Sequence, residues 1–368
     1  MKDNYNIFIG TSVHRWNDNR IFHKEAVSLA KKFNVQLHAP ADFDKKVING
    51  VSIIGLPNWK KETDRKFIRK QLWDRLKKNN SDIFIFHDPE LIWIGIKAAI
   101  LLKLKVVYDI HENTIESILR KKWLNPIGKL IAIIGYSFLQ KISKLFFSHY
   151  LLAEDSYRTL IKKNSTVIHN YPLKMDYKIQ SSKEYDLVYL GDITEDRGAL
   201  IMVKVISILK KSYPNINLIL IGKVSPRLED ILSNSITKYQ LENNIKLLGY
   251  INYYEAMEIV CKSKIGLCLL KPIKNYINSY PTKLFDYMQV GIPYLCSKFP
   301  LYEKLLDKCD AGISVDPLDV KGVASAIISL LDDSEEYNRL SHNGITALNQ
   351  NFNWSTQEKE LYNVIQSF

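Results

Sequence analysis

Cysteine is scarce in this chain, and its spacing excludes the common metal-binding motifs. The four cysteines among 368 residues all lie in the second half, at Cys261, Cys268, Cys296 and Cys309. They lack the paired spacing of metal ligands, and three of them have apolar neighbours. We therefore expect core thiols in a reducing compartment and no bound metal.

Long apolar runs are also missing. No stretch of about 18 uncharged apolar residues occurs, and the N-terminus runs directly into a strand-like pattern with no apolar signal region. We therefore expect a cytoplasmic protein. The first loop, Gly10–Arg20, contains no Gly-x-Gly-x-x-Gly motif, which argues against a dinucleotide cofactor.

Strand-like and helix-like segments alternate through both halves of the chain. Hydrophobic residues make up 46% and charged residues 24% of the sequence, which is ordinary globular usage, and 368 residues exceed what one core organises. The alternation predicts the α/β class, with parallel sheets covered by helices on both faces. The polar stretch 172–184 marks a boundary, so we predict domains at residues 1–175 and 176–352.

Positive charge is concentrated in the first half. Residues 1–175 contain 30 Lys and Arg against 16 Asp and Glu, a net charge of +14, whereas residues 176–368 carry a net charge of −2. A basic half of this kind could bind nucleic acid, an anionic membrane surface or an anionic substrate, and the charge alone does not separate these.

One amphipathic segment carries part of this charge. Within Arg120–Phe147, a basic cluster with Trp123 precedes an apolar stretch that Lys129 interrupts, and the segment is too broken to span a bilayer. Two interpretations stay open. The segment could lie in a membrane interface, where Lys and Arg meet anionic lipids, or it could be a helix packed on its own sheet.

A short segment of the second half, Asn278–Pro293, has the pattern of an anion-binding corner. Pro281 and Thr282 suit the first positions of a helix, whose free N–H groups attract anions, and Lys283 adds a mobile cation. The helix is expected to end at the Gly-Ile-Pro that closes the segment. On the alternative interpretation, this is an ordinary buried helix after a turn.

This pattern resembles the donor-site signature of glycosyltransferase family 4, the retaining nucleotide-sugar enzymes with the two-domain GT-B fold. Family members usually carry two acidic residues with seven residues between them, and Asn278 and Asp286 occupy these positions here. The resemblance implies that Asp286 binds the ribose and that Asn278 lies near the sugar, without the charge of the usual Glu. It also assigns four intervening residues to the donor site: Ser279, Tyr280, Pro281 and Thr282.

A second stretch, Gly191–Gly198, looks like the family's diphosphate loop. A basic pair is usual there, and this chain has Asp192 at the first position and Arg197 at the second. The resemblance implies that Arg197 and Lys283 stabilise charge on the leaving nucleotide diphosphate without a metal; taken alone, Arg197 would be a solvated loop charge. Further donor-site positions implied by the resemblance are Gly191, Gly222, Lys223, Tyr250 and Ile251.

In the first half, polar residues follow two strand-like segments. His111 matches a family histidine placed near the transferred sugar, although a capping contact with Asp109 or Glu112 is an alternative. His87 and Asp88 end the preceding strand, and ends of neighbouring parallel strands meet at one edge, so we expect convergence on an acceptor. The first loop is also expected to face the acceptor, through His14, Arg15, Asp18 and Arg20. Its two arginines would meet an acceptor diphosphate or remain solvated.

The resemblance implies a GT-B protein of two Rossmann-like domains facing a central cleft, with the final helix 353–368 crossing back to the N-terminal acceptor domain. It implies a retaining transferase that moves a hexose-type sugar from a nucleotide diphosphate sugar, of the UDP type, to a glycan hydroxyl. We expect a lipid-linked acceptor in surface polysaccharide synthesis, and a location at the inner face of the cell membrane. No cofactor beyond this co-substrate is expected, and no nucleic-acid partner.

Other classes remain open at this stage. Asn278 and Asp192 favour a degenerate sugar site in a protein that binds membranes or nucleic acid. A GT-B sugar-nucleotide epimerase is a further alternative, whereas the absence of a pyridoxal-lysine motif argues against a phosphorylase.

Overall fold

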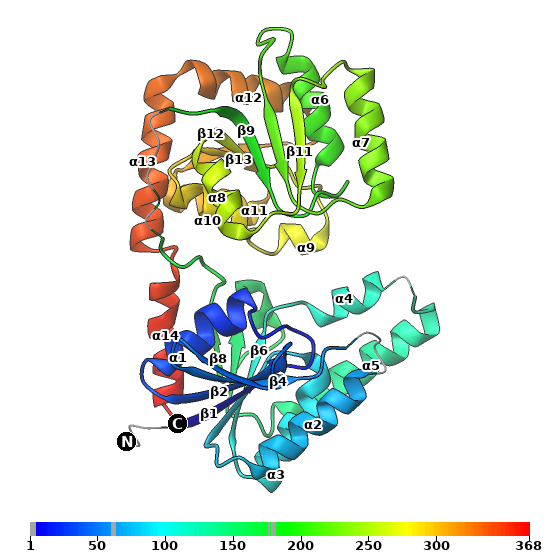
Figure 1. Ribbon diagram of the computed structural model, residues 1–368, viewed down its shortest axis with the longest axis vertical. Helices are drawn as coiled ribbons and strands as arrows, with labels where there is room; N and C mark the ends of the chain where they lie inside the picture. The colour runs from blue at the N-terminus through cyan, green and yellow to red at the C-terminus, as the bar shows by residue number, and fades with distance from the viewer. Residues whose placement is uncertain (1–4, 60–63, 122, 176, 178–181) are drawn as a thin grey trace. The chain divides into compact units, whose positions relative to one another are not determined.

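The computed structural model describes residues 5–59, 64–121, 123–175, 177 and 182–368. The chain divides into an N-terminal unit, Met1–Asn170 with Trp354–Phe368, and a C-terminal unit, Tyr171–Asn353 (Figure 1). The division falls a few residues before the predicted boundary at 175/176, and residues 176 and 178–181 of the predicted linker lie outside the described part. Each unit is described by itself.

The N-terminal unit is built on an eight-stranded sheet with the order β3-β4-β2-β1-β5-β6-β7-β8. Its strands are β1 (Asn6–Gly10), β2 (Asn34–Pro40), β3 (Lys45–Ile48), β4 (Val51–Leu56), β5 (Ile83–Phe86), β6 (Lys105–Ile110), β7 (His149–Leu152) and β8 (Ser165–Val167). All neighbours pair in parallel except the edge pair β3 and β4. The central strand β5 is buried along its whole length, as expected for a parallel sheet covered on both faces.

Two hydrophobic clusters cover the two faces of this sheet. Along β1, Phe8 belongs to one cluster while Ile7 and Ile9 belong to the other, because successive side chains of a strand point to opposite faces. The helices of the unit are η1 (Asn19–Ala26), α1 (Val27–Ala30), α2 (Arg65–Lys78), η3 (Pro89–Leu91), α3 (Ile92–Leu101), α4 (Thr114–Arg120), α5 (Pro126–Ser143), η4 (Asp155–Thr159) and α14 (Trp354–Gln366).

The last helix, α14, packs on this unit although the C-terminal unit precedes it in the chain. Its Trp354 Nε1 donates a hydrogen bond to Ser28 Oγ at 2.8 Å, and its Tyr362 hydroxyl donates to the Ser28 carbonyl at 2.7 Å. Trp354 and Leu361 are part of the same cluster as Ile7 and Ile9. The end of the chain therefore completes the core of the N-terminal unit.

The C-terminal unit has a six-stranded parallel sheet with the order β11-β10-β9-β12-β13-β14. Its strands are β9 (Tyr185–Leu190), β10 (Leu218–Ile221), β11 (Ile245–Gly249), β12 (Ser263–Cys268), β13 (Tyr294–Ser297) and β14 (Gly312–Val315). Its helices are α6 (Ala199–Leu209), α7 (Pro226–Lys238), α8 (Tyr253–Cys261), α9 (Lys274–Ile277), α10 (Thr282–Gln289), α11 (Pro300–Cys309), α12 (Val320–Asp332) and α13 (Ser334–Gln350).

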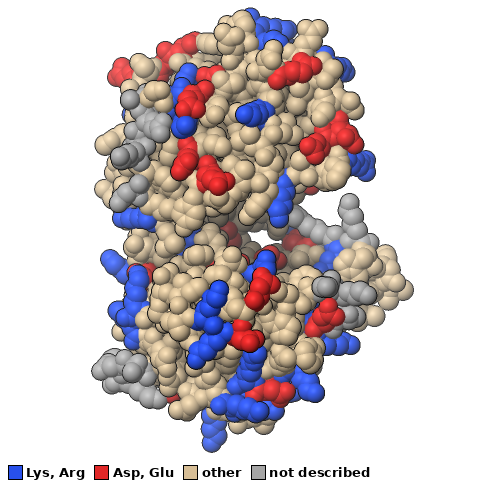
Figure 2. Space-filling view, in the orientation of Figure 1, with Lys and Arg blue, Asp and Glu red and all other residues tan. Residues whose placement is uncertain are grey.

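Each face of this second sheet also carries its own buried cluster. The predicted class, α/β with two doubly wound parallel-sheet domains, is therefore confirmed. All four cysteines are free and buried. Across the described ranges, no helix is both long and apolar enough to cross a membrane. Figure 2 shows more Lys and Arg than Asp and Glu on the visible face of the N-terminal unit.

Candidate active site

Two cations of the C-terminal unit meet at the end of strand β9. Gly191 follows this strand with a φ of +119°, and a Cβ added there would lie 3.5 Å from Lys283 Nζ and 3.6 Å from Arg197 Nη1. Lys283 comes from the first turn of α10, and Arg197 from the loop before α6. The structure thus brings together the two cations that the family resemblance assigns to one diphosphate.

Lys283 is buried beside an aromatic ring. Its side chain is 7% exposed, and Nζ has no hydrogen-bond partner among the described residues. Nζ lies 3.6 Å from the centroid of the Tyr189 ring, which is a cation–π contact. Burial lowers the pKa of Lys283 to about 7. A buried ammonium is costly unless an anion pairs with it, so this site is suited to take up negative charge.

The position of Lys283 is fixed by the helix that carries it. From Lys283 to Gln289, every residue of α10 is buried. The Tyr287 hydroxyl accepts a hydrogen bond from the backbone N–H of Leu190 at 3.2 Å and donates to the Leu267 carbonyl at 3.1 Å. These bonds tie α10 to strands β9 and β12, so the ammonium has little freedom to leave the Gly191 corner.

Arg197 is more exposed than Lys283 and has local partners. Its Nε donates to the Tyr276 hydroxyl at 3.3 Å, and its Nη1 lies 3.9 Å from Asp192 Oδ2. The Asp192 side chain is 60% exposed. A solvated carboxylate at that distance holds the guanidinium weakly, so an incoming phosphate can compete with it.

Gly198 in the diphosphate loop and Gly222 after strand β10 permit close backbone approach. A Cβ on Gly222, whose φ is +151°, would lie 2.0 Å from the carbonyl oxygen of Gly191. Gly198 has a φ of +82°, and a Cβ there would lie 2.1 Å from the carbonyl oxygen of Leu269. Both positions exclude a side chain, so the loop can fold tightly beside Lys283.

Asp286, the predicted ribose ligand, lies one turn after Lys283 and is 6% exposed. Its Oδ1 accepts a hydrogen bond from the Tyr253 hydroxyl at 2.8 Å. Burial and the neighbouring carboxylate raise the pKa of Tyr253, so this hydroxyl stays protonated and continues to donate. Nearby, Tyr250 is 71% exposed, and Lys223 Nζ lies 5.0 Å from its ring centroid.

The side chains of Asn278 and Ser279 form hydrogen bonds with backbone carbonyls of helix α9. The Asn278 Nδ2 donates to the Lys274 carbonyl at 2.9 Å, and the Ser279 hydroxyl donates to the Asn275 carbonyl at 2.6 Å. Both side chains thereby satisfy carbonyls that the short helix leaves open. The Tyr280 ring packs against Phe285 at 6.0 Å between centroids. Asn278 thus has a local structural role beside the predicted sugar contact.

A cavity of about 560 Å³ lies next to the diphosphate loop. Residues 192–196 and 223–225 line it together with the first turns of α7. Its charged lining residues are of both signs: Asp192, Glu195, Asp196, Lys223 and Arg227. Asp192 belongs both to this lining and to the corner at Gly191, where it lies 3.9 Å from Arg197.

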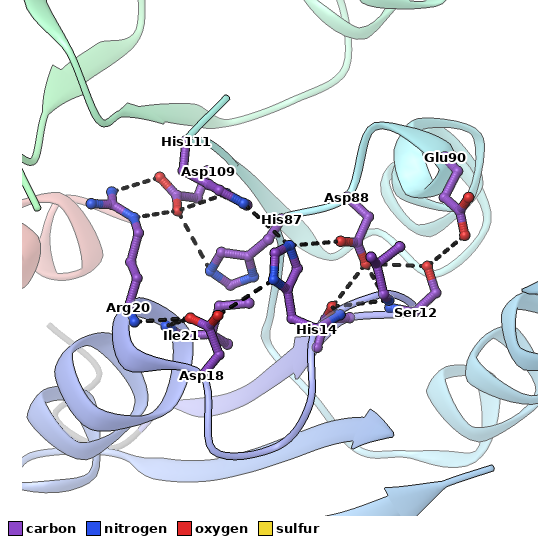
Figure 3. Close-up of polar contacts among 12 residues, drawn as sticks. Ser12, His14, Asp18, Arg20, Ile21, His87, Asp88, Glu90, Asp109 and His111 are labelled. Atoms are coloured by element: carbon purple, nitrogen blue, oxygen red, sulfur yellow. Dashed lines mark hydrogen bonds and ion pairs between the residues drawn. The ribbon is translucent and has the colours of Figure 1, made fainter. Parts of the chain in front are cut away.

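In the N-terminal unit, two histidines from separate loops are in contact (Figure 3). His111 Nε2 lies 3.2 Å from His14 Nε2, and His14 Nδ1 lies 3.4 Å from Asp18 Oδ2. Burial lowers the pKa of His111 to about 4. For His14, burial also lowers the pKa, but the hydrogen bond to Asp18 and the negative charges of Asp88, Asp18 and Glu112 together outweigh it, so the pKa is raised. The two pKa shifts favour a protonated His14 as the donor to a neutral His111.

Asp88 holds the first loop against strand β5. Its Oδ2 accepts hydrogen bonds from the Thr11 hydroxyl at 2.9 Å and from the Ser12 backbone N–H at 2.5 Å. Its Oδ1 lies 3.5 Å from His14 Nε2. His87, Asp88 and His111 lie together at the carboxyl ends of their strands, as predicted, beside His14 and Asp18 of the first loop (Figure 3). However, His87 and Asp88 are only 1% and 2% exposed and are bonded within the unit, so the structure does not place them in contact with an acceptor.

Arg20 is placed differently from the expectation. It is 5% exposed, and its Nε and Nη2 donate to the two carboxylate oxygens of Asp109 at 2.7 and 2.8 Å. Its Nη1 donates to the Ile168 carbonyl at 2.9 Å. Because the guanidinium is buried and hydrogen-bonded to Asp109 and Ile168, Arg20 is not available for the expected contact with an acceptor diphosphate. Arg15 is exposed and forms a surface ion pair with Asp42 at 2.6 Å.

Arg20 belongs to a buried charged cluster that also contains Glu25, His87 and Asp109. His87 Nε2 lies 2.8 Å from Glu25 Oε2, and Arg20 Nε lies 3.0 Å from Glu25 Oε1. Possible ligand atoms of the two carboxylates and His87 lie within 4.8 Å of one another, as a metal site would require. Arg20 and His87 each contact both carboxylates, so the cluster is better described as a buried ion-pair network.

The family comparison concerns mainly the C-terminal unit. Residues 174–347 match the model "Glycosyl transferases group 1". Among curated proteins, a glycogen synthase of Mycobacterium tuberculosis is 19% identical over 171 residues, which is 46% of this chain and 40% of that protein. The match thus spans about two fifths of that relative. These findings support a glycosyltransferase of the GT-B type.

Solved structures resemble the chain over nearly its whole length. Sucrose-phosphate synthase from Thermosynechococcus elongatus has a TM-score of 0.75 at 13% identity, covering 99% of this chain and 98% of that one. HepE from Anabaena in complex with UDP and glucose has a TM-score of 0.74 at 14% identity, covering 99% and 100%. The fold is therefore GT-B. The diphosphate loop and the Asn278–Pro293 segment both lie inside the matched residues 174–347.

Sequence reasoning missed several residues of the two sites. Tyr189 and Tyr253 contact Lys283 and Asp286, but both belong to apolar patterns with no local signal of such contacts. Glu25 lies inside a helix and was also missed. Asp109 was considered only as a capping partner of His111, yet it left a usable signal, because it interrupts the apolar run of β6 two residues before His111.

Proposed function

We propose that this chain is a retaining glycosyltransferase of the family 4 type that transfers a hexose-type sugar from a nucleotide diphosphate sugar, without a metal. The observation that carries the proposal is the buried Lys283 ammonium, which has no hydrogen-bond partner among the described residues and lies beside Gly191 and Arg197. A diphosphate would supply the negative charge that the corner lacks.

In this proposal, Lys283 and Arg197 act on the leaving group. As the bond between the sugar C1 and the phosphate oxygen breaks, its electron pair moves to that oxygen. Two preorganised cations stabilise this charge more in the transition state than in the ground state. The acceptor hydroxyl oxygen bonds to C1 on the face that the phosphate leaves, and its proton passes to the departing phosphate. The anomeric configuration is thereby retained.

The nucleotide is proposed to be of the UDP type, with its ribose on Asp286 and its base near Tyr250 and Ile251. The complex of HepE with UDP and glucose supports this choice, as does the Tyr253 hydroxyl that orients Asp286. Lys223, beside the Tyr250 ring, adds positive charge at the same end of the sheet.

The acceptor is proposed to be a glycan on a lipid carrier, used in surface polysaccharide or glycoconjugate synthesis at the inner face of the cell membrane. The net charge of +14 on residues 1–175 supports an anionic surface or carrier. His111, whose pKa burial lowers to about 4, is neutral near pH 7 and can hydrogen-bond a sugar hydroxyl. Arg15 is the exposed cation of the first loop.

Calorimetric titration with UDP, GDP, ADP and CDP, without added metal, tests the donor site. We expect micromolar binding of UDP, and a loss of about 10- to 100-fold in Lys283→Ala, because a charged hydrogen bond contributes roughly 1.5–3 kcal/mol. Lys304→Ala, an exposed lysine on α11, serves as the matched control and should bind normally. Failure of all four nucleotides to bind would contradict the proposal and favour a degenerate sugar site.

A further inference from the structure

Helix α5 carries a row of exposed apolar side chains along one face. The exposed fractions are 70% for Ile127, 65% for Ile131, 59% for Ile134 and 62% for Phe138, and Leu130 beside them is 58% exposed. With about 100° between successive residues, these positions fall within an arc of roughly 100°. We call these five residues the α5 row.

The α5 row is not needed to attach the helix to its own unit. The opposite face of α5 contains Tyr136, Gln140 and Ser143, which are all buried. Ser143 Oγ lies 2.7 Å from the Tyr150 hydroxyl of β7, and Tyr136 belongs to the cluster on that side of the sheet. The sequence left open whether this segment packs on its sheet or lies in a membrane interface. The structure uses one face for packing and leaves a second apolar face exposed.

The segment of the chain that carries the α5 row is positively charged. From residue 117 to residue 153 the sequence contains six Lys and Arg and not one Asp or Glu. Lys141 continues the row on the same face and is exposed, and Trp123, 63% exposed, lies with its ring centroid 5.2 Å from Lys121 Nζ. Lys122 and the side chain of Arg120, also in the predicted basic cluster, lie outside the described part of the chain.

We propose that the α5 row and its flanking lysines dock on the surface of an anionic lipid bilayer, with the helix lying parallel to the membrane plane. Aliphatic and phenyl side chains enter the boundary between headgroups and acyl chains, while Lys121 and Lys141 meet anionic headgroups and Trp123 lies at the interface. Asn125 starts the helix, because its Oδ1 accepts from the Gly128 N–H at 2.7 Å, so the row begins at a defined end.

Other occupants fit this surface less well. A second copy of the chain would bring the same acid-free basic segment against itself, and the like charges would repel. Nucleic acid would bind the lysines but would leave five aliphatic and aromatic side chains against phosphates and water. A bilayer with anionic lipids matches both the apolar row and the charge.

The test is co-sedimentation of the full chain with vesicles of phosphatidylcholine alone and of phosphatidylcholine with about a third phosphatidylglycerol. No nucleotide sugar is present, so the result does not depend on the proposed reaction. We expect binding to the anionic vesicles only, weakened by high salt.

The double variant Ile131→Ser and Phe138→Ser should bind at least tenfold more weakly, because each side chain loses apolar contact with lipid. Leu318→Ser is the matched control, since this residue is 60% exposed in the C-terminal unit.

A second variant removes charge and leaves the apolar row intact. Lys121→Gln with Lys141→Gln should weaken binding by roughly fivefold per lysine, whereas Lys304→Gln with Lys308→Gln on α11 should leave it unchanged. Circular dichroism and thermal melting should be the same for all variants, because every substituted side chain is at least partly exposed. Equal binding to neutral and anionic vesicles, or no binding, would overturn the proposal. Concentration-dependent dimers that dissociate in the Ile131 and Phe138 variant would overturn it in favour of self-association.

Discussion

At the scale of single residues, Lys283 carries a conflict between folding and binding. Burial lowers its pKa to about 7, compared with the ordinary lysine value of 10.5. Keeping an uncompensated ammonium in an apolar site destabilises the folded protein, and a bound phosphate removes the penalty. The charged form of Lys283 is therefore stabilised only when an anion binds beside it. For this reason Lys283 is the strongest single indication of the donor site.

This conflict predicts a pH-dependent stability difference between the wild type and Lys283→Met. Between pH 7 and 10.5 the unfolded chain keeps the lysine proton and the folded chain does not. The free energy of unfolding of the wild type should therefore rise with pH in this window, by at most about 1.4 kcal/mol per pH unit. The methionine variant lacks this contribution, so it should be the more stable protein below pH 7 and lose its advantage toward pH 10.

Urea denaturation of the two proteins without nucleotide, at several pH values from 6.5 to 10, measures the difference. Subtracting the two curves removes the titration of all other groups that the two proteins share. If the difference in unfolding free energy does not change with pH over this range, Lys283 keeps its ordinary pKa. Water would then reach its ammonium group more readily than the structure indicates.

Arg20 shows where reasoning at the residue scale fails. From the sequence it was one of two loop arginines near an expected acceptor, and nothing local distinguished it from Arg15. In the structure, Arg20 pairs with Asp109, which is 89 residues away, because β6 lies two strands from β1 in the sheet. The order of strands, which the alternating pattern does not specify, decides which charges meet. The buried network with Glu25 was unpredictable for the same reason.

At the scale of elements, the strand and helix pattern could be predicted because hydrophobic periodicity determines it. The meeting of Arg197 and Lys283 was also predicted, but through the resemblance of both motifs to the donor site of family 4 glycosyltransferases and not from periodicity. The first helical segment of the chain, η1, is a π-helix and not a regular α-helix. Asp18 starts this segment by accepting hydrogen bonds from the N–H groups of Arg20 and Ile21. The wider turn accompanies the burial of charged side chains, which periodicity cannot foresee.

The turn before α6 leads to a prediction about two glycines. Gly198 and Gly249 have similar φ values of +82° and +68°, but a Cβ would meet the Leu269 carbonyl at 2.1 Å only at Gly198, with nothing within 4 Å at Gly249. Gly249→Ala should cost about 1–2 kcal/mol, the strain of a left-handed residue. Gly198→Ala should cost clearly more and should also weaken UDP binding, because the backbone next to Arg197 must move.

Chemical denaturation gives the two stability losses, and calorimetry gives the UDP affinities. Equal losses for the two variants would show that the loop relaxes around the added methyl group without cost. In that case the tight contact with Leu269 would not be what positions Arg197.

At the scale of the whole molecule, the chain begins and ends in the same unit, and this predicts where a distant substitution acts. Leu361 on α14 is fully buried among residues of the N-terminal unit, beyond the entire C-terminal unit in sequence. Leu361→Ala should therefore destabilise the N-terminal unit by about 2–5 kcal/mol, the usual effect of a core truncation that leaves a cavity. Hydrogen exchange should show lost protection in β1, β2 and η1, which share that core, while β9 to β13 keep theirs.

The control is Lys359→Ala, an exposed residue on the same helix, which should change neither the stability nor the exchange protection. Equal loss of protection in both sheets would mean that the two units unfold as one cooperative body, and that α14 stabilises the whole chain.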